Sequence, residues 1–185
     1  AGTSLDADVD GTLKLANGGI SRTFRPNSYI TAWIPKPPVV TAIEAAFAAR
    51  KFAEVPAMVD KVYPKLRWLG WGGTLAAMKG KCFLVQAQFK DAEQAFADGQ
   101  KYEKLFTEVL TDLRTGVVQA LIGLEKFDDA ERALASLGTA DAKAAPYIYK
   151  ARGYLREKRG KRKEAVLEYL KIVLLYPDAG AVRKE

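Results

Sequence analysis

Four stretches of the chain between residues 38 and 177 place apolar and polar residues in the same order. Each has an amphipathic segment, a short turn with an aromatic or basic residue, and a small residue near the start of a second amphipathic segment. In the second stretch the apolar residues recur at steps of three and four: Phe83, Leu84, Ala87, Ala92, Ala95 and Phe96. This spacing is typical of helices with one buried face, so the pattern predicts four helix–turn–helix units.

The turns occur at a regular period. The small residues that close them are 37, 38 and 35 residues apart: Val55, Ala92, Ala130 and Ala165. Acidic side chains stand beside them, and these suit the positive end of a helix that begins there. One helix pair of this length cannot bury its apolar face alone, so the units are expected to stack into a continuous core. The alternative is an irregular helical bundle whose periodicity is accidental.

The phased set resembles the tetratricopeptide repeat family over residues 38–177. Gly80 and Gly153 stand twelve residues before the small residue, where the family prefers glycine, and Phe96 and Tyr169 stand four after it. Ile43 and Val118 depart from the glycine position. The resemblance implies a mainly α fold, a right-handed α-α superhelix of about four helix pairs. It also implies a non-catalytic scaffold that binds a peptide or protein segment in its concave groove.

The resemblance implies a set of groove positions on the first helix of each pair. The residues expected to contact a partner are Glu44, Lys81, Gln119, Tyr147, Lys150 and Tyr154. The repeat position of Lys150 is held by Val40, Ala77 and Thr115 in the three earlier units, and these are expected to line the groove as well. Tyrosine and lysine would suit an extended peptide or an acidic segment. These side chains could instead solvate an unused face, or the N-terminal residues could fill the groove. The family's carboxylate clamp is not reproduced, because asparagine occurs only at positions 17 and 27.

Residues 1–37 break the helical period and form a predicted leader, followed by a repeat domain at 38–185. Residues 12–16 and 20–24 alternate around Asn17-Gly18-Gly19, which predicts a β-hairpin, and 29–34 could add a third strand. Pro35, Pro37 and Pro38 predict a stiff joint. The hairpin is expected to cap the first helix pair, or to pair its edge with a partner or a second copy.

The layout of a β-rich leader before helical repeats is similar to that of uncharacterised exported bacterial tetratricopeptide proteins. That likeness implies a place in a bacterial cell-envelope assembly, periplasmic or otherwise exported. A cytoplasmic location is the alternative. A self-associating structural subunit, joined through the leader strands or the ends of the array, is the second functional hypothesis. A homodimer is therefore a possible state.

The amino-acid composition excludes several kinds of catalytic and metal-binding site. The chain has no histidine and one cysteine, which excludes histidine triads, histidine-ligated zinc and disulfide frameworks. We therefore expect no enzyme, no cofactor and no metal. Cys82 falls at core spacing and is expected to be a buried small residue. No apolar run approaches the ~20 residues of a membrane span. Trp68 and Trp71 are expected to pack between the first two repeats.

The charge of the chain is unevenly placed. The net charge is +7, and residues 141–185 hold most of the excess of lysine and arginine, chiefly in 152–163. Such a run could bind nucleic acid. It also spans a predicted helix end and a turn, where cations are favourable and solvated. The second explanation is preferred, and no nucleic-acid partner is expected.

Overall fold

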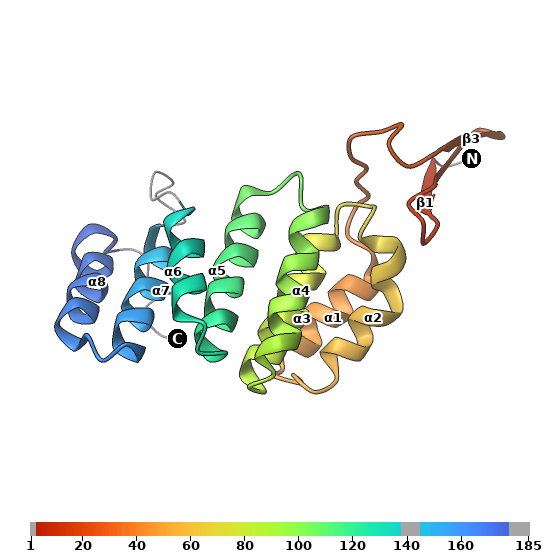
Figure 1. Cartoon of the computed structure of the whole chain (residues 1–185). Coiled ribbons are helices and arrows are strands. Elements are labelled where there is room, and N and C mark those ends of the chain that lie inside the picture. The colour runs from red at the N-terminus through yellow and green to blue at the C-terminus, as the bar shows by residue number, and fades with distance from the viewer. Residues whose placement is uncertain (1–2, 138–144, 178–185) are drawn as a thin grey trace.

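The computed structural model describes residues 3–137 and 145–177, which form a small sheet followed by helices (Figure 1). The strands are β1 (Ser4–Ala7), β2 (Leu13–Asn17) and β3 (Ile20–Phe24). The helices are α1 (Pro38–Ala48), α2 (Val55–Leu66), α3 (Gly72–Val85), α4 (Phe89–Tyr102), α5 (Thr107–Gly123), α6 (Phe127–Ala135), α7 (Ala145–Lys158) and α8 (Arg162–Leu175). The mainly helical fold is thus as predicted. No helix in the described ranges is long and apolar enough to cross a membrane.

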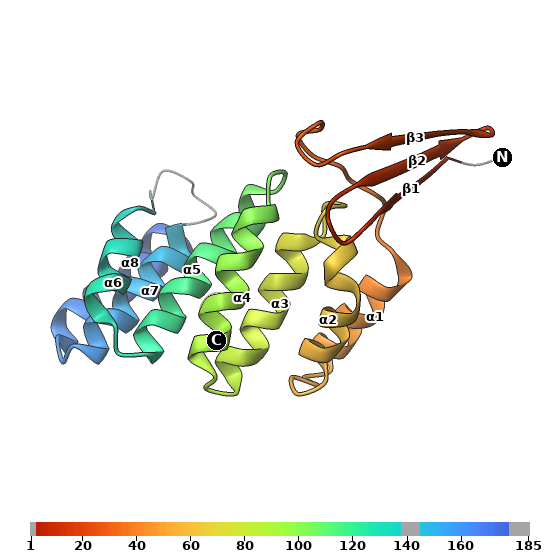
Figure 2. The ribbon, with the colours of Figure 1, turned by 45° about the vertical axis from the view of Figure 1, so that its right-hand side comes forward.

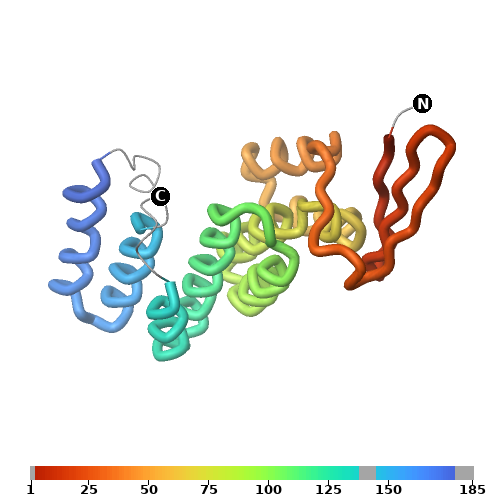
Figure 3. Tube along the Cα trace, turned by 90° about the horizontal axis from the view of Figure 1, so that it is seen from above, coloured from red at the N-terminus to blue at the C-terminus, as the bar shows by residue number. Residues whose placement is uncertain are grey.

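The helices follow one another in an elongated array, with the sheet at one end and α8 at the other (Figures 1 and 3). Each helix packs on the next one in the chain. The first helices of successive predicted pairs also contact one another, α1 with α3, α3 with α5 and α5 with α7. The backbones of α2, α4, α6 and α8 do not approach one another in this way, although the rings of Tyr63 on α2 and Tyr102 on α4 meet edge-on at 6.1 Å. The first helices therefore lie closer together than the second helices do.

Each first helix ends in the same turn. Arg50, Ala87, Glu125 and Gly160 adopt positive φ between 56° and 75°. In each turn the amide of that residue and the amide of the next donate back to the last turn of the helix, as Ala87 N does to Leu84 O (3.1 Å) and Gln88 N to Phe83 O (2.9 Å). This is the Schellman arrangement, which satisfies carbonyl groups that a helix end leaves unpaired. The sequence period thus corresponds to a repeated backbone turn.

The predicted small residues are all buried. Ala92 and Ala130 are fully buried, and Ala165 is 3% exposed. Beside them, a Cβ added to Gly80 would meet the ring of Phe96, and one added to Gly153 would meet the ring of Tyr169. The two pairs that lack this glycine also lack the aromatic ring: Ile43 with Val59, and Val118 with Leu134, all buried. Each pair therefore fills its core with complementary volumes, a small residue opposite a ring or two aliphatic residues.

The leader forms a three-stranded antiparallel sheet in the order β1-β2-β3. The predicted hairpin is confirmed: Asn17 pairs with Ile20 across Gly18 and Gly19, both with positive φ. The predicted third strand at 29–34 is wrong. The third strand is β1, which pairs with β2.

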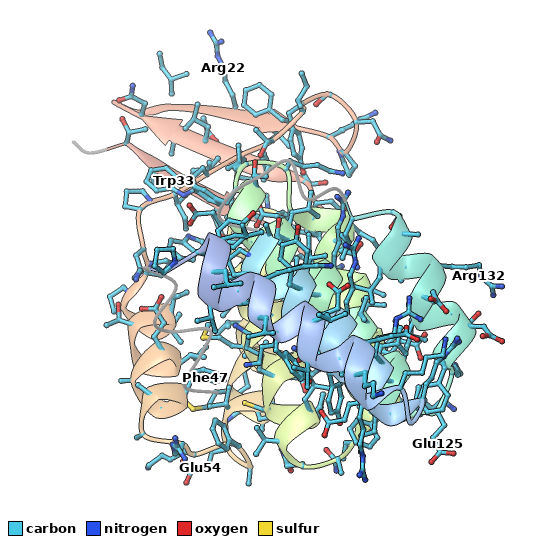
Figure 4. All side chains as sticks on the ribbon, turned by 90° about the vertical axis from the view of Figure 1, so that its left-hand side faces the viewer. Arg22, Trp33, Phe47, Glu54, Glu125 and Arg132 are labelled. Atoms are coloured by element: carbon cyan, nitrogen blue, oxygen red, sulfur yellow. The ribbon has the colours of Figure 1, made fainter. Side chains whose placement is uncertain are left out.

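Residues 29–34 instead tie the sheet to the helices. The Tyr29 hydroxyl donates to Gly11 O, Ile34 N donates to Leu69 O, and the Trp33 ring lies against Gly70. Figure 4 shows Trp33 between the sheet and the helices. Tyr29, Ala32 and Ile34 pack on the core of the leader and the first helix pair, whereas Ile30 is 95% exposed. Tertiary contacts outweigh the strand propensity of this segment.

The leader shares its core with the first helix pair. Ala7 and Leu13 belong to the same buried cluster as Val55 and Val59. The loop between β1 and β2 lies over the connection between α2 and α3 (Figure 2), where Trp68 Nε1 donates to Val9 O (3.3 Å). Trp68 also meets the ring of Tyr102 edge-on at 5.0 Å. Trp68 thus packs between the leader and the first two repeats, at the junction predicted for it.

Candidate functional site

The six predicted partner-binding residues all lie on first helices, and we call them together the first-helix face. Glu44 is on α1, Lys81 on α3 and Gln119 on α5, while Tyr147, Lys150 and Tyr154 are on α7. Glu44, Lys81, Gln119 and Tyr154 share one repeat phase, and the four helices contact one another in a row. The face therefore runs along the array as a series of equivalent positions.

Three further positions of the predicted groove are not available to a partner. Val40, Ala77 and Thr115 are between 0% and 4% exposed. The Thr115 hydroxyl donates to Thr111 O and to Asp112 O within its own helix, both at 3.0 Å. The expectation that these three contact a ligand is wrong, because packing of the first helices against their neighbours covers them.

Charged residues of the first-helix face are paired at its α1 and α3 end. Lys36 Nζ lies 2.8 Å from Glu44 Oε2, and Lys81 Nζ lies 2.6 Å from Asp112 Oδ2 of α5. Both pairs are partly exposed, so each contributes little to stability. They do hold Glu44 and Lys81 in place and neutralise their charge. Asp112 lies in the next helix pair, seven residues before Gln119, so its pairing with Lys81 joins α3 to α5.

The α7 part of the face is different. Tyr147 is 42% exposed and Tyr154 is 37% exposed, although both are large and aromatic. They stand seven residues apart with Lys150 between them, so all three lie on one side of the helix. The Lys158 ammonium lies 5.5 Å from the Tyr154 ring centroid. Exposed tyrosines beside lysines provide flat apolar area and hydrogen-bonding groups for an extended, acidic segment.

Acidic residues of α6 neutralise part of the basic run at 152–163. Arg156 lies 3.0 Å from Glu131 Oε1, and Arg159 pairs with both Asp128 and Glu131. The run spans the end of α7, the turn at Gly160 and the start of α8, as predicted. Two of its arginines therefore join α6 to α7.

The described residues hold little reactive chemistry. Cys82 is fully buried, and burial raises the pKa of its thiol to about 11. This agrees with the prediction of a small core residue. No group of acidic or cysteine residues in the described ranges could hold a metal ion. Gly72 and Gly73 are in contact with Tyr102 and Glu103, so they serve close packing of α3 on α4.

A buried carboxylate that the sequence did not point out lies at the end of α4. Glu103 is 5% exposed, and its Oε1 accepts hydrogen bonds from Leu105 N (2.9 Å) and Phe106 N (2.8 Å) just before α5. It also lies against Gly73 at the start of α3. Its position holds the connection between the second and third helix pairs.

No protein-family model matches the chain, and no curated protein or solved structure is significantly similar to it.

Proposed function

We propose that the protein is a non-catalytic scaffold that binds a peptide or protein segment along the first-helix face. The observation that carries this proposal is the pair of exposed tyrosines, Tyr147 and Tyr154, on one side of α7 with Lys150 between them. Exposed aromatic side chains with a nearby cation are typical anchors of protein interfaces. The ligand that fits this chemistry is an extended segment with acidic and aromatic residues.

We also propose that the array is a tetratricopeptide-like superhelix with the first-helix face on its concave side. The closer backbone approach of successive first helices, compared with successive second helices, supports this curvature. The four Schellman turns at the repeat phase support a common unit. On the layout of leader and repeats we place the protein in a bacterial cell-envelope assembly, which fractionation of cells that express it would test.

The binding proposal is tested with a panel of peptides. Extended peptides rich in Glu and Phe are expected to bind, and the same peptides with Lys in place of Glu are not. Lys150→Glu should weaken the acidic peptides by about tenfold or more, and Tyr147→Ala with Tyr154→Ala should abolish the signal. Lys90→Glu, an exposed charge reversal on the second helix α4, is the matched control and should bind normally.

Two results would refute the binding proposal. One is that no peptide of the panel binds to the folded chain. The other is that acidic peptides bind equally well after the two tyrosines are replaced. Circular dichroism would show that each variant keeps its helices, so a loss of binding reports on the face and not on folding.

A further inference from the structure

The last described helix exposes an apolar side, which we call the α8 outer face. It consists of five residues between 43% and 73% exposed: Val166, Leu167, Leu170, Val173 and Leu174. Their spacing of three and four places them on one side of the helix. Ala165 and Ile172, on the other side, are buried. Figure 4 looks at the array from this end, and α8 lies in front of the other helices.

Stacking of helix pairs does not require apolar residues at these positions. In α4, which packs on a following pair, the same five repeat phases hold mostly polar residues that remain partly or fully accessible: Glu93, Gln94, Ala97, Gln100 and Lys101. The apolar character of α8 therefore goes beyond what another repeat would use. This indicates that the face contacts something other than a further helix pair.

A further helix pair, stacked in the same way, would also meet a lysine. Lys150 stands at the repeat phase that the three earlier pairs fill with Val40, Ala77 and Thr115, all buried. Continuation of the array would have to bury the long Lys150 side chain at a position where the earlier pairs bury an aliphatic or small residue. The α8 end is thus built unlike the junctions between pairs.

We propose that the α8 outer face binds the same face of a second copy of the chain, with the two helices antiparallel. Leu170 lies at the centre of the five residues, so a two-fold axis beside it would bring the two Leu170 side chains together. The same axis places Val166 opposite Leu174 of the second copy. Such a contact is self-complementary, as a two-fold interface requires, and it closes without leaving an apolar end.

The charges at the ends of α8 favour the antiparallel orientation. The helix starts with Arg162 and Lys163, and no basic residue stands in its last turn. Neither cation has an ion-pair partner in the described part of the chain, and cations are unfavourable at the N-terminus of their own helix. In an antiparallel pair, Lys163 would reach the C-terminal end of α8 in the second copy, where the carbonyl groups attract positive charge. The first turns of α4 and α8 are alike, with Lys90 and Asp91 in α4 and Lys163 and Glu164 in α8, but only α4 has a lysine, Lys101, in its last turn.

The size of the face also fits a dimer. Five large aliphatic side chains at these exposures present on the order of 500 Å² of apolar surface, near the upper end of the largest patch on typical monomers. A standard interface buries about 800 Å² on each partner. The α8 outer face, with the polar residues beside it, would supply most of that area.

The oligomeric state of the whole chain tests the proposal. Size-exclusion chromatography with light scattering, over a dilution series, should show a dimer that dissociates on dilution. Leu170→Asp should raise the dissociation constant by about 100-fold or more, because both copies lose a buried leucine. Val85→Asp, at a valine on α3 that is 63% exposed, is the control for an added surface charge and should leave the dimer intact. A chain that is monomeric at all concentrations would overturn the proposal.

Cross-linking tests the orientation. In a Cys82→Ala background, Leu170→Cys should form a disulfide-linked dimer, whereas Val166→Cys and Leu174→Cys should cross-link only when the two proteins are mixed. Efficient cross-linking of Val166→Cys alone would indicate parallel helices and overturn the antiparallel arrangement. Leu170-dependent binding of a monomeric chain to anionic vesicles would overturn the dimer and assign the face to a membrane surface. The peptide-binding test uses α7 and not α8, so failure of one proposal leaves the other standing.

Discussion

Replacement of Gly80 by alanine would place a methyl group in the space that Phe96 occupies. A Cβ at this position lies 2.6 Å from Phe96 Cε1, 2.7 Å from Cζ and 2.8 Å from Cδ1. A Cβ on Gly116 of α5 would meet the same three atoms, so the ring is enclosed by both helices. Phe96 is 1% exposed and cannot turn toward solvent. The strain must therefore be taken up by a shift of α3, α4 or α5.

The expected loss follows from two opposing effects. Alanine is preferred to glycine inside a helix by about 1 kcal/mol. Overpacking of a closely packed core costs about 1–3 kcal/mol, and contacts under 3 Å to three atoms of one rigid ring favour the upper part of that range. We expect Gly80→Ala to lower the free energy of unfolding by about 1–2 kcal/mol. For a domain of this size that corresponds to a fall in Tm of about 3–6 °C.

A double-mutant cycle isolates the contact. Phe96→Leu alone should destabilise the protein by about 1–2 kcal/mol, because it leaves a cavity between α3, α4 and α5. In the Phe96→Leu background, Gly80→Ala should cost nothing or stabilise, since the new methyl group enters that cavity. The coupling, measured by urea unfolding followed by circular dichroism, should reach about 1–2 kcal/mol. Additive effects of the two substitutions would refute the argument from complementary volumes.

Three further predictions concern the turns, the buried carboxylate and the thiol. Ala87→Gly should raise the free energy of unfolding by about 0.5–1 kcal/mol and Gly160→Ala should lower it by about 1 kcal/mol, because both residues have positive φ; thermal unfolding measures both. Glu103→Ala should lower it by about 1–3 kcal/mol by leaving two amides unpaired, and an unchanged Tm would contradict the role given to Glu103. Folding raises the pKa of Cys82 from 9.0 to about 11, so stability should fall as the pH rises through this interval, and Cys82→Ala should remove that part of the fall. Native Cys82 should also resist alkylation at pH 9.

The repeat phase could be predicted because each unit needs the same residue types at the same places. Ala92, Ala130 and Ala165 are buried at the predicted positions, and the turns that precede them share one backbone conformation. The leader was harder, because strand propensity does not reveal the neighbour of a strand. Ser4–Ala7 is only four residues long and has few strand formers, yet it pairs with β2, whereas 29–34 is rich in strand formers and lies across the helices.

The positions of the candidate site residues on the helices could be predicted from the repeat, but the exposure of their side chains could not. Glu44 and Lys81 lie where the phase places them, but each is paired with a charge that only the fold brings near. Val40 and Thr115 share a groove phase with Lys150, and contacts between neighbouring helices decide that only the lysine remains partly accessible. The α8 outer face could have been found from the sequence. Its signal is a set of valines and leucines at phases that α4 fills with polar residues.

Different contacts are made at the two ends of the helical array, and this difference links the proposed ligand binding to the proposed dimer. Every stacked array exposes an apolar face at each end. At the first end the leader packs on the helices from within the chain, since Ala7 and Leu13 enter the core of the first helix pair. The α8 end has no such cover among the described residues. If a second copy covers it, the tyrosines of α7 remain outside the contact and each dimer presents two first-helix faces. A ligand with two binding segments would then bind the dimer more tightly than a single segment does, and Leu170→Asp would remove that gain while leaving single-segment affinity unchanged.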